Sequence, residues 1–255
     1  MTLPPLSTPA KLKQRHSSTT SSGSECPFAN PDTAISDNPT SHCPFHAHKA
    51  LPTPASIQGP VDLVVDHGTF TTTAKSANLL HDIGGGDKIR EVCTRFYARA
   101  FLDDQLKPFF FEEDGATAHG QRLADWIVQK MGGEGTPWSD SGRWGMRQPS
   151  HAKAWYNEKR HSSVRGNAFN LVDSRTWMRI HFWAARECGL AAHAAFWDWY
   201  VRFLQHFIAV YEWRAVPFAA EDASWAADPD NVDAYIQNGH RMPDLHDTGY
   251  DSEDY

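Results

Sequence analysis

The sequence contains few cysteines and none of the spacings that cysteine-rich proteins show. Its four cysteines stand at positions 26, 43, 93 and 188, and no two of them form a Cys-x-x-Cys pair. Two lie in a polar N-terminal stretch and two in predicted helices. The sequence therefore predicts no disulfide framework.

Long apolar runs and clusters of positive charge are also lacking. No stretch approaches the roughly 18 consecutive apolar residues of a membrane-spanning helix, and no signal-peptide core is found. The net charge of −7 is uneven: residues 219–255 hold ten acidic residues and one arginine, which leaves the rest near +2. We therefore expect neither a membrane span nor a nucleic-acid partner. A cytoplasmic location is the default expectation, although residues 1–24, basic and free of acidic residues, weakly resemble an organelle transit peptide.

What the chain does have is length and aromatic side chains. Its 255 residues are 40% hydrophobic and include ten Trp, seven Tyr and fourteen Phe, enough for one sizeable core. Composition divides the chain into three parts. We expect a disordered, low-complexity arm over residues 1–75, a helical domain over 76–218 and an acidic, partly disordered tail over 219–255.

The arm contains a near-repeat, Cys26-Pro27-Phe28 and Cys43-Pro44-Phe45, the second with histidines at 42, 46 and 48. A thiolate before a proline resembles short haem-regulatory motifs, and the thiolate and imidazole ligands of residues 42–48 also suit zinc. Two Cys-Pro pairs by chance in a proline-rich arm are the simpler interpretation.

The middle part shows the apolar spacing of amphipathic helices. Helices are predicted over 76–81, 87–102, 117–131, 174–188 and 194–212. Gly84, Gly85 and Gly86 follow the first of these helices, at a turn where glycine tolerates positive φ and close backbone approach. Pro108 marks a break after the second helix, and the aromatic stripe over 194–212 is interpreted as core rather than as a cofactor site.

Three types of ring side chain stand in places where they could line one apolar pocket. They are the Tyr97 phenol, the aromatic run Phe109–Phe111, and the imidazoles of His119 and His151. Short runs around them match a known family in order and spacing: IGGGDKIREVCTRFYARAFLDDQLKPFFFEED (83–114), HGQRLADWIVQKMGG (119–133), W-S-D…M-R-x-x-x-H (138–151) and TWMRIHF (176–182). In these runs the chain resembles the truncated haemoglobins, and within them the second group. The resemblance implies an all-α fold, a 2-over-2 helical sandwich, that binds haem b.

The resemblance also assigns an iron ligand. His151 falls where the family has its iron-ligating histidine, but about twenty extra residues, 152–171, follow it. A register that ignores this insertion would place His181 there instead. The spacing from Trp138 favours His151, and Trp177 then falls on the family's tryptophan. Lys153, Lys159, Arg160 and Arg165 within the insertion are candidates for contacts to the haem propionates, the alternative being a plain surface insertion.

The remaining pocket residues receive roles from the same resemblance. Phe110 would pack flat against the porphyrin, with Leu123 and Trp126 as an apolar wall. Tyr97, Trp177 and His119 would donate hydrogen bonds to an iron-bound ligand, and His119 is alternatively a sixth ligand. Each also has an ordinary alternative as a core or surface side chain.

Three functions follow from this pocket. The first is a haem protein for dioxygen, nitric oxide and carbon monoxide, serving redox chemistry of the nitric-oxide dioxygenase type or sensing rather than bulk transport. The second is a peroxide-using haem enzyme with His119 as acid/base. The third is a haem-free helical scaffold on a globin frame. The chain has no flavin or nicotinamide segment, so turnover requires an external reductase. The oligomeric state stays open.

Overall fold

Helices account for most of the described chain, as the apolar spacing predicts. The structure, a computed structural model, describes residues 59–246. The two Cys-Pro motifs, the transit-like start and the last nine residues of the tail therefore lie outside the described residues. The helices are α1 (Ala74–Asp82), α2 (Gly85–Ala100), α3 (Gly115–Met131), α4 (Pro137–Asp140), α5 (Arg147–Trp155), α6 (Leu171–Glu187), α7 (Ala194–Ile208), α8 (Ala219–Trp225), α9 (Pro229–Gln237) and α10 (Pro243–His246). The predicted all-α class is confirmed.

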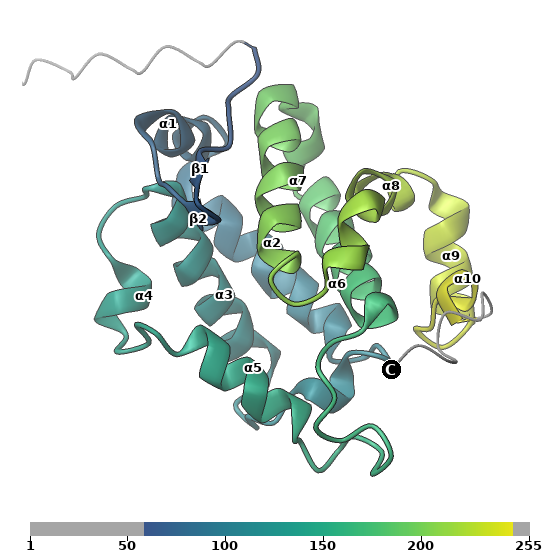
Figure 1. The fold of residues 1–255 in the computed structure, drawn as a ribbon. Coiled ribbons are helices and arrows are strands. Elements are labelled where there is room, and N and C mark those ends of the chain that lie inside the picture. Colours follow the sequence, from purple (N-terminus) through teal and green to yellow (C-terminus); the bar gives the residue numbers. More distant parts are fainter. Residues whose placement is uncertain (1–58, 247–255) are drawn as a thin grey trace, which may run out of the picture. The chain divides into compact units, whose positions relative to one another are not determined.

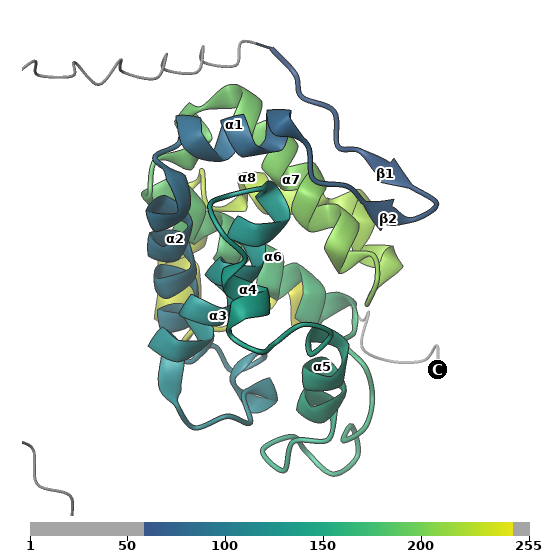
Figure 2. The same cartoon turned by 90° about the vertical axis from the view of Figure 1, so that its left-hand side faces the viewer.

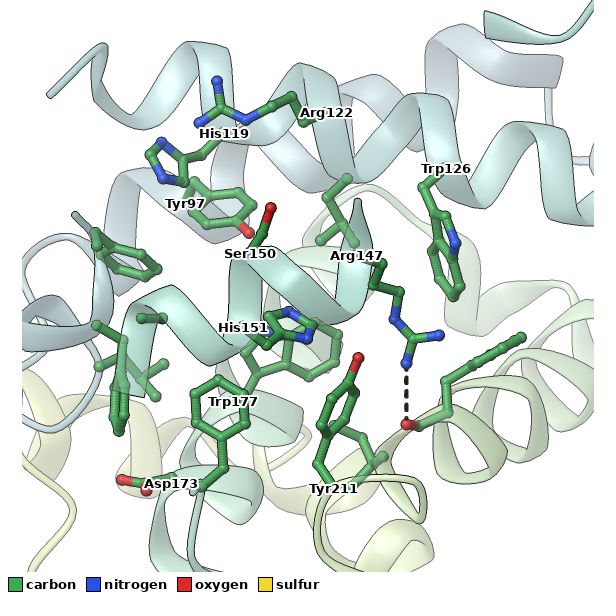
Figure 3. Close-up of a pocket in the computed structure, with 18 of the residues that line it drawn as sticks. Tyr97, His119, Arg122, Trp126, Arg147, Ser150, His151, Asp173, Trp177 and Tyr211 are labelled. Atoms are coloured by element: carbon green, nitrogen blue, oxygen red, sulfur yellow. Dashed lines mark hydrogen bonds between the residues drawn. The ribbon is translucent and has the colours of Figure 1, made fainter. Parts of the chain in front are cut away.

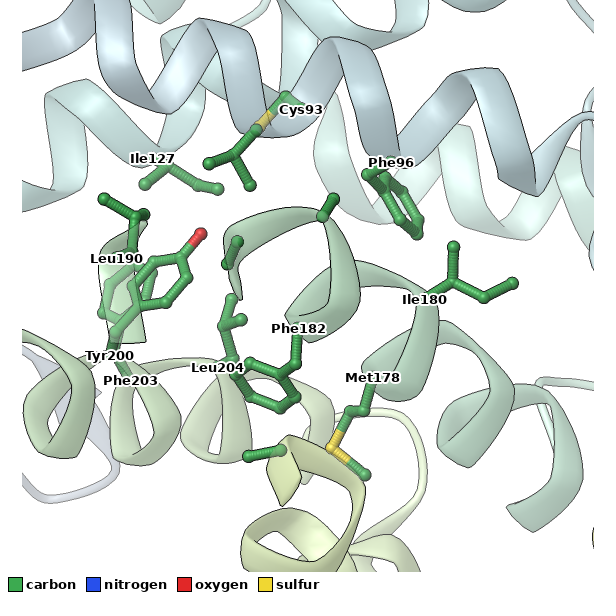
Figure 4. Close-up of a cluster of buried hydrophobic side chains, with 14 of the residues drawn as sticks. Cys93, Phe96, Ile127, Met178, Ile180, Phe182, Leu190, Tyr200, Phe203 and Leu204 are labelled. Atoms are coloured by element: carbon green, nitrogen blue, oxygen red, sulfur yellow. The ribbon is translucent and has the colours of Figure 1, made fainter. Parts of the chain in front are cut away.

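The long helices form two layers. Helices α2 and α3 pack along one another, and α6 and α7 lie across them (Figures 1 and 2). Gly120 on α3 permits this approach, because a Cβ at that position would stand 3.1 Å from the Cys93 carbonyl oxygen on α2. The core lies between the layers and joins Phe96 of α2, Phe182 of α6 and Tyr200 of α7, each 0% exposed (Figure 4).

Local sequence explains where several of these helices begin. Gly84 and Gly85 have positive φ angles of 102° and 76°, which confirms that the turn between α1 and α2 relies on glycine. Helix α6 begins earlier than the expected Asp173-Ser174 cap. Asn170 is its N-cap, and Asp173 completes a capping box as the third helical residue. Helix α2 ends at Ala100, well before Pro108, which sits in a 3₁₀ turn, Lys107–Phe109.

The segment before α1 contributes to the core although it lies within the predicted arm. Strands β1 (Val65–Asp66) and β2 (Thr69–Phe70) form an antiparallel hairpin. Phe70 packs edge-on against Trp199 and Phe203 of α7, with ring centroids 6.1 and 5.3 Å apart. One large aromatic side chain thus anchors residues that composition alone assigns to a disordered stretch.

Residues 219–246, the described part of the acidic tail, are helical and pack on α6 (Figure 1). Asp222 of α8 is 0% exposed and accepts hydrogen bonds from Arg175 and Arg179 of α6. Tyr235 of α9 donates to Asp103 at 3.0 Å. The predicted tail therefore extends the helical fold through buried polar contacts. Within residues 59–246, no helix combines the length and apolarity needed to cross a membrane.

Candidate functional site: an aromatic cavity beside His151

A cavity of about 230 Å³ lies between α3, α5, α6 and the end of α7. Its walls are mainly aromatic and aliphatic (Figure 3). All seven site residues predicted from the sequence line it: Tyr97, Phe110, His119, Leu123, Trp126, His151 and Trp177. They come from five separate segments, so tertiary folding brings together what the sequence distributes over 81 positions.

His151 projects from α5 into this cavity (Figure 3). Its ring packs edge-on against Tyr211 at 4.6 Å and Phe169 at 5.4 Å, and its Nδ1 atom is buried with no hydrogen-bond partner. Burial, together with the nearby Arg147 charge, lowers the pKa of His151 to about 4. The imidazole is therefore neutral at physiological pH, the form in which histidine binds a metal.

Arg147 stands one helical turn before His151 and lines the same cavity (Figure 3). Its guanidinium lies over the rings of Trp126, Phe207 and Tyr211, at 4.8, 4.9 and 5.0 Å from their centroids. It donates a hydrogen bond to the Phe207 carbonyl oxygen at 3.3 Å. Burial lowers the pKa of Arg147, although the guanidinium stays charged. An aromatic enclosure thus holds a cation on the His151 side of the cavity.

The opposite end holds Tyr97 and His119 within an aromatic group. The His119 ring packs against Tyr97, Phe101 and Phe110 at 5.3, 5.1 and 5.4 Å, and Phe101 stacks on Phe110 at 4.4 Å. The Tyr97 hydroxyl points towards the cavity (Figure 3). Burial raises the pKa of Tyr97, so the phenol keeps its proton and remains a hydrogen-bond donor.

His119 differs from the donor role expected for it. Its Nδ1 lies 3.0 Å from the Gly115 carbonyl oxygen, which can only accept, so the ring proton is on Nδ1. Burial lowers the pKa of His119, which favours the neutral ring. The Nε2 atom therefore carries a lone pair. It suits an acceptor or a metal ligand rather than a donor.

Trp177 and His181 are neighbours on α6, but only Trp177 reaches the cavity. Their rings stack at 4.7 Å with an interplanar angle of 9°, and His181 is 0% exposed. The His181 Nε2 atom lies 2.8 Å from the Tyr200 hydroxyl, within the core. The alternative iron ligand thus faces away from the cavity that His151 lines.

Charged residues form one edge of the cavity. Arg122 pairs with Glu112 at 2.6 Å and with Asp114 at 2.5 Å, and Arg143 approaches Glu112 at 3.9 Å. Atoms of Glu112, Asp114 and His119 that could bind a metal lie within 4.8 Å of one another, but both carboxylates are already paired with Arg122. This edge is therefore an ion-pair cluster.

Several cavity residues were not predicted. The basic side chains of the insertion, at 153, 159, 160 and 165, do not line the cavity; Arg122, Arg143 and Arg147 do. The i, i+4 spacing of Arg147 and His151 could have signalled their common face. Tyr211 was assigned to a core stripe, yet the C-terminal end of that stripe lines the cavity.

Fold and site together define an all-α domain with an aromatic cavity, which the neutral His151 imidazole and the Tyr97 phenol both line. The sequence model of the bacterial-like globins matches residues 78–163, about a third of the chain. This match contains α2, α3, α5 and His151, and ends before Trp177. No curated protein and no solved structure matched the chain. The similarity to bacterial-like globins thus agrees with the family resemblance seen in the sequence; the second-group assignment remains a prediction.

Proposed function

We propose that the cavity binds haem, that His151 is the proximal iron ligand, and that the protein binds dioxygen and related diatomic gases. The observation that carries the proposal is the His151 ring: it is neutral, it lines an aromatic cavity, and its buried Nδ1 has no partner. The bacterial-like globin match covers this residue. A haem held by the His151 imidazole alone would leave its iron able to bind a gas.

The surrounding residues have distinct roles in this proposal. Phe110, Leu123 and Trp126 supply apolar walls that exclude water from the macrocycle. The Tyr97 hydroxyl and the Trp177 indole N–H are the donors that stabilise a polar bound gas. His119 presents a lone pair at Nε2, so it either accepts a hydrogen bond or competes for the iron as a sixth ligand.

Retention of dioxygen by donors suits redox chemistry or sensing better than bulk transport, because tight retention slows release. Bound haem would supply the redox chemistry for a reaction such as nitric-oxide dioxygenation, and an external reductase would have to supply the electrons for turnover.

A visible spectrum of purified protein after reconstitution with hemin, ferric and dithionite-reduced, tests the proposal. We expect a Soret band that collapses or shifts in His151→Ala and persists in His181→Ala. His161→Ala, an exposed histidine in the insertion, is the matched control. Circular dichroism establishes that each variant is folded.

Two further outcomes are informative, one for the function and one for the role of His119. A wild-type protein that is folded but shows no Soret band would refute the haem proposal and favour a haem-free helical scaffold. A six-coordinate ferrous spectrum that becomes five-coordinate in His119→Ala would assign the sixth ligand to His119.

A further inference from the structure

The positively charged Arg147 guanidinium lies at an apolar cavity, where few neighbouring groups can balance its charge. Of its five N–H donors, one bonds to the Phe207 carbonyl oxygen. It forms no ion pair with a carboxylate among residues 59–246; its other close neighbours are the three aromatic rings of Trp126, Phe207 and Tyr211. Other arginines at the cavity edge, by contrast, pair with acids: Arg122 with Asp114 and Glu112.

The positive charge acts on His151. The two residues are four apart on α5, so they share one helix face, and both line the cavity. Both side chains also pack against Tyr211: its ring centroid lies 5.0 Å from the Arg147 guanidinium and 4.6 Å from the centroid of the His151 ring. A charge in a partly desolvated site is screened less than one at the surface. Positive charge added at the imidazole is therefore disfavoured.

Nothing among the described residues offsets this effect from the other side of the ring. A ligating histidine gains basicity when its second nitrogen donates to a carbonyl or carboxylate oxygen. The buried Nδ1 of His151 has no such partner. The imidazole would thus give the iron little electron density, with a cation close by.

We propose that Arg147 raises the reduction potential of an iron bound by His151, so that the ferrous, gas-binding state is favoured over the ferric state. The inference rests on the proposed function. Reduction adds one electron, supplied by an electrode mediator or a reductase, and lowers the positive charge that Arg147 faces. The same arrangement disfavours peroxide cleavage, which an electron-rich axial ligand promotes.

Spectroelectrochemical titration of the haem-loaded full chain tests this role. We expect Arg147→Gln to favour the ferric state by about tenfold at a fixed potential, a fall of about 59 mV for a one-electron couple. Arg147→Lys, which keeps the charge, should restore most of the wild-type value. Lys75→Gln is the matched control, since it removes one positive charge from an exposed position on α1 outside the cavity. In this control the ferric-to-ferrous ratio at a fixed potential should differ from the wild-type ratio by less than twofold.

Three results would overturn the inference. The first is an unchanged midpoint in Arg147→Gln with a wild-type Soret band. The second is an equal fall in Lys75→Gln, which would make the effect one of net charge. The third is loss of haem from Arg147→Gln but not from Arg147→Lys, which would assign Arg147 to a porphyrin carboxylate. Failure of the proposed function is separate, because it appears as a missing Soret band in the wild-type protein.

Discussion

The buried carboxylate of Asp222 makes the strongest prediction about what holds the cavity helices in place. Asp222 is 0% exposed on α8 and accepts from Arg175 at 2.8 and 3.1 Å and from Arg179 at 2.8 Å. Both arginines belong to α6, which also carries Trp177. Loss of this carboxylate would therefore weaken the attachment of the C-terminal helices to a helix that lines the cavity.

The expected cost of Asp222→Asn follows from the partners that remain. Breaking a buried ion pair costs about 3–5 kcal/mol, because the remaining charge is left uncompensated. Here Arg175 keeps Glu221 at 2.5 Å and Arg179 keeps Asp244 at 2.6 Å. We therefore expect the lower end, about 3 kcal/mol, and a melting temperature about 6–12 °C lower for a domain of this size.

Urea denaturation followed by circular dichroism measures this change, with all variants in the same haem-loading state. Asp198→Asn is the matched control, since Asp198 is 56% exposed and pairs with Arg202 on the surface of α7. Its loss should cost about 0.5 kcal/mol or less. A loss below about 1 kcal/mol in Asp222→Asn would refute the reasoning and show that Glu221 and Asp244 suffice.

Two further predictions concern the histidine buried in the core and the phenol in the cavity. Burial lowers the pKa of His181 to about 3, from about 6.5. The unfolded chain thus binds more protons between these pH values, and the free energy of unfolding should fall as the pH drops below 6.5. The urea midpoint, measured at pH 7.5, 6 and 5, should decline less with falling pH in His181→Gln than in the wild-type protein. An identical decline in the two proteins would contradict this prediction. Tyr97→Phe should speed dioxygen dissociation by roughly fivefold, the effect of losing a hydrogen bond of about 1 kcal/mol; stopped-flow rates equal to wild type would remove Tyr97 as a donor.

Helical periodicity made much of this fold predictable. Apolar side chains at intervals of three and four must share a helix face, so the buried faces of α2 and α3 follow from the spacing of their apolar residues. The turn at Gly84 and Gly85 was equally predictable, because residues other than glycine rarely adopt positive φ. Seven of the residues that line the cavity were predicted from this spacing together with the family resemblance, whereas Arg122, Arg143, Arg147 and Tyr211 were not.

Interactions between distant residues were not predictable in this way. Acidic composition predicted a partly disordered tail, but composition does not show that Asp222 meets Arg175 and Arg179 across 47 and 43 positions. Likewise, the Phe70 ring packs against Phe203 of α7, which lies far along the chain. Such pairings depend on which helix faces meet, and local sequence carries no record of that.

The sequence by itself determined the five apolar patterns that form helices α1, α2, α3, α6 and α7, and the glycine turn, because local spacing and backbone preference govern these. With the family resemblance it also indicated seven of the residues that line the cavity. The tertiary structure alone decided that His151 lines the cavity while His181 bonds to Tyr200 in the core. It also decided that the Nδ1–H group of His119 donates to the Gly115 carbonyl oxygen, and that Arg147 lies among aromatic rings beside His151. The physical reason is that the protonation, charge environment and direction of a side chain are set by its neighbours in space.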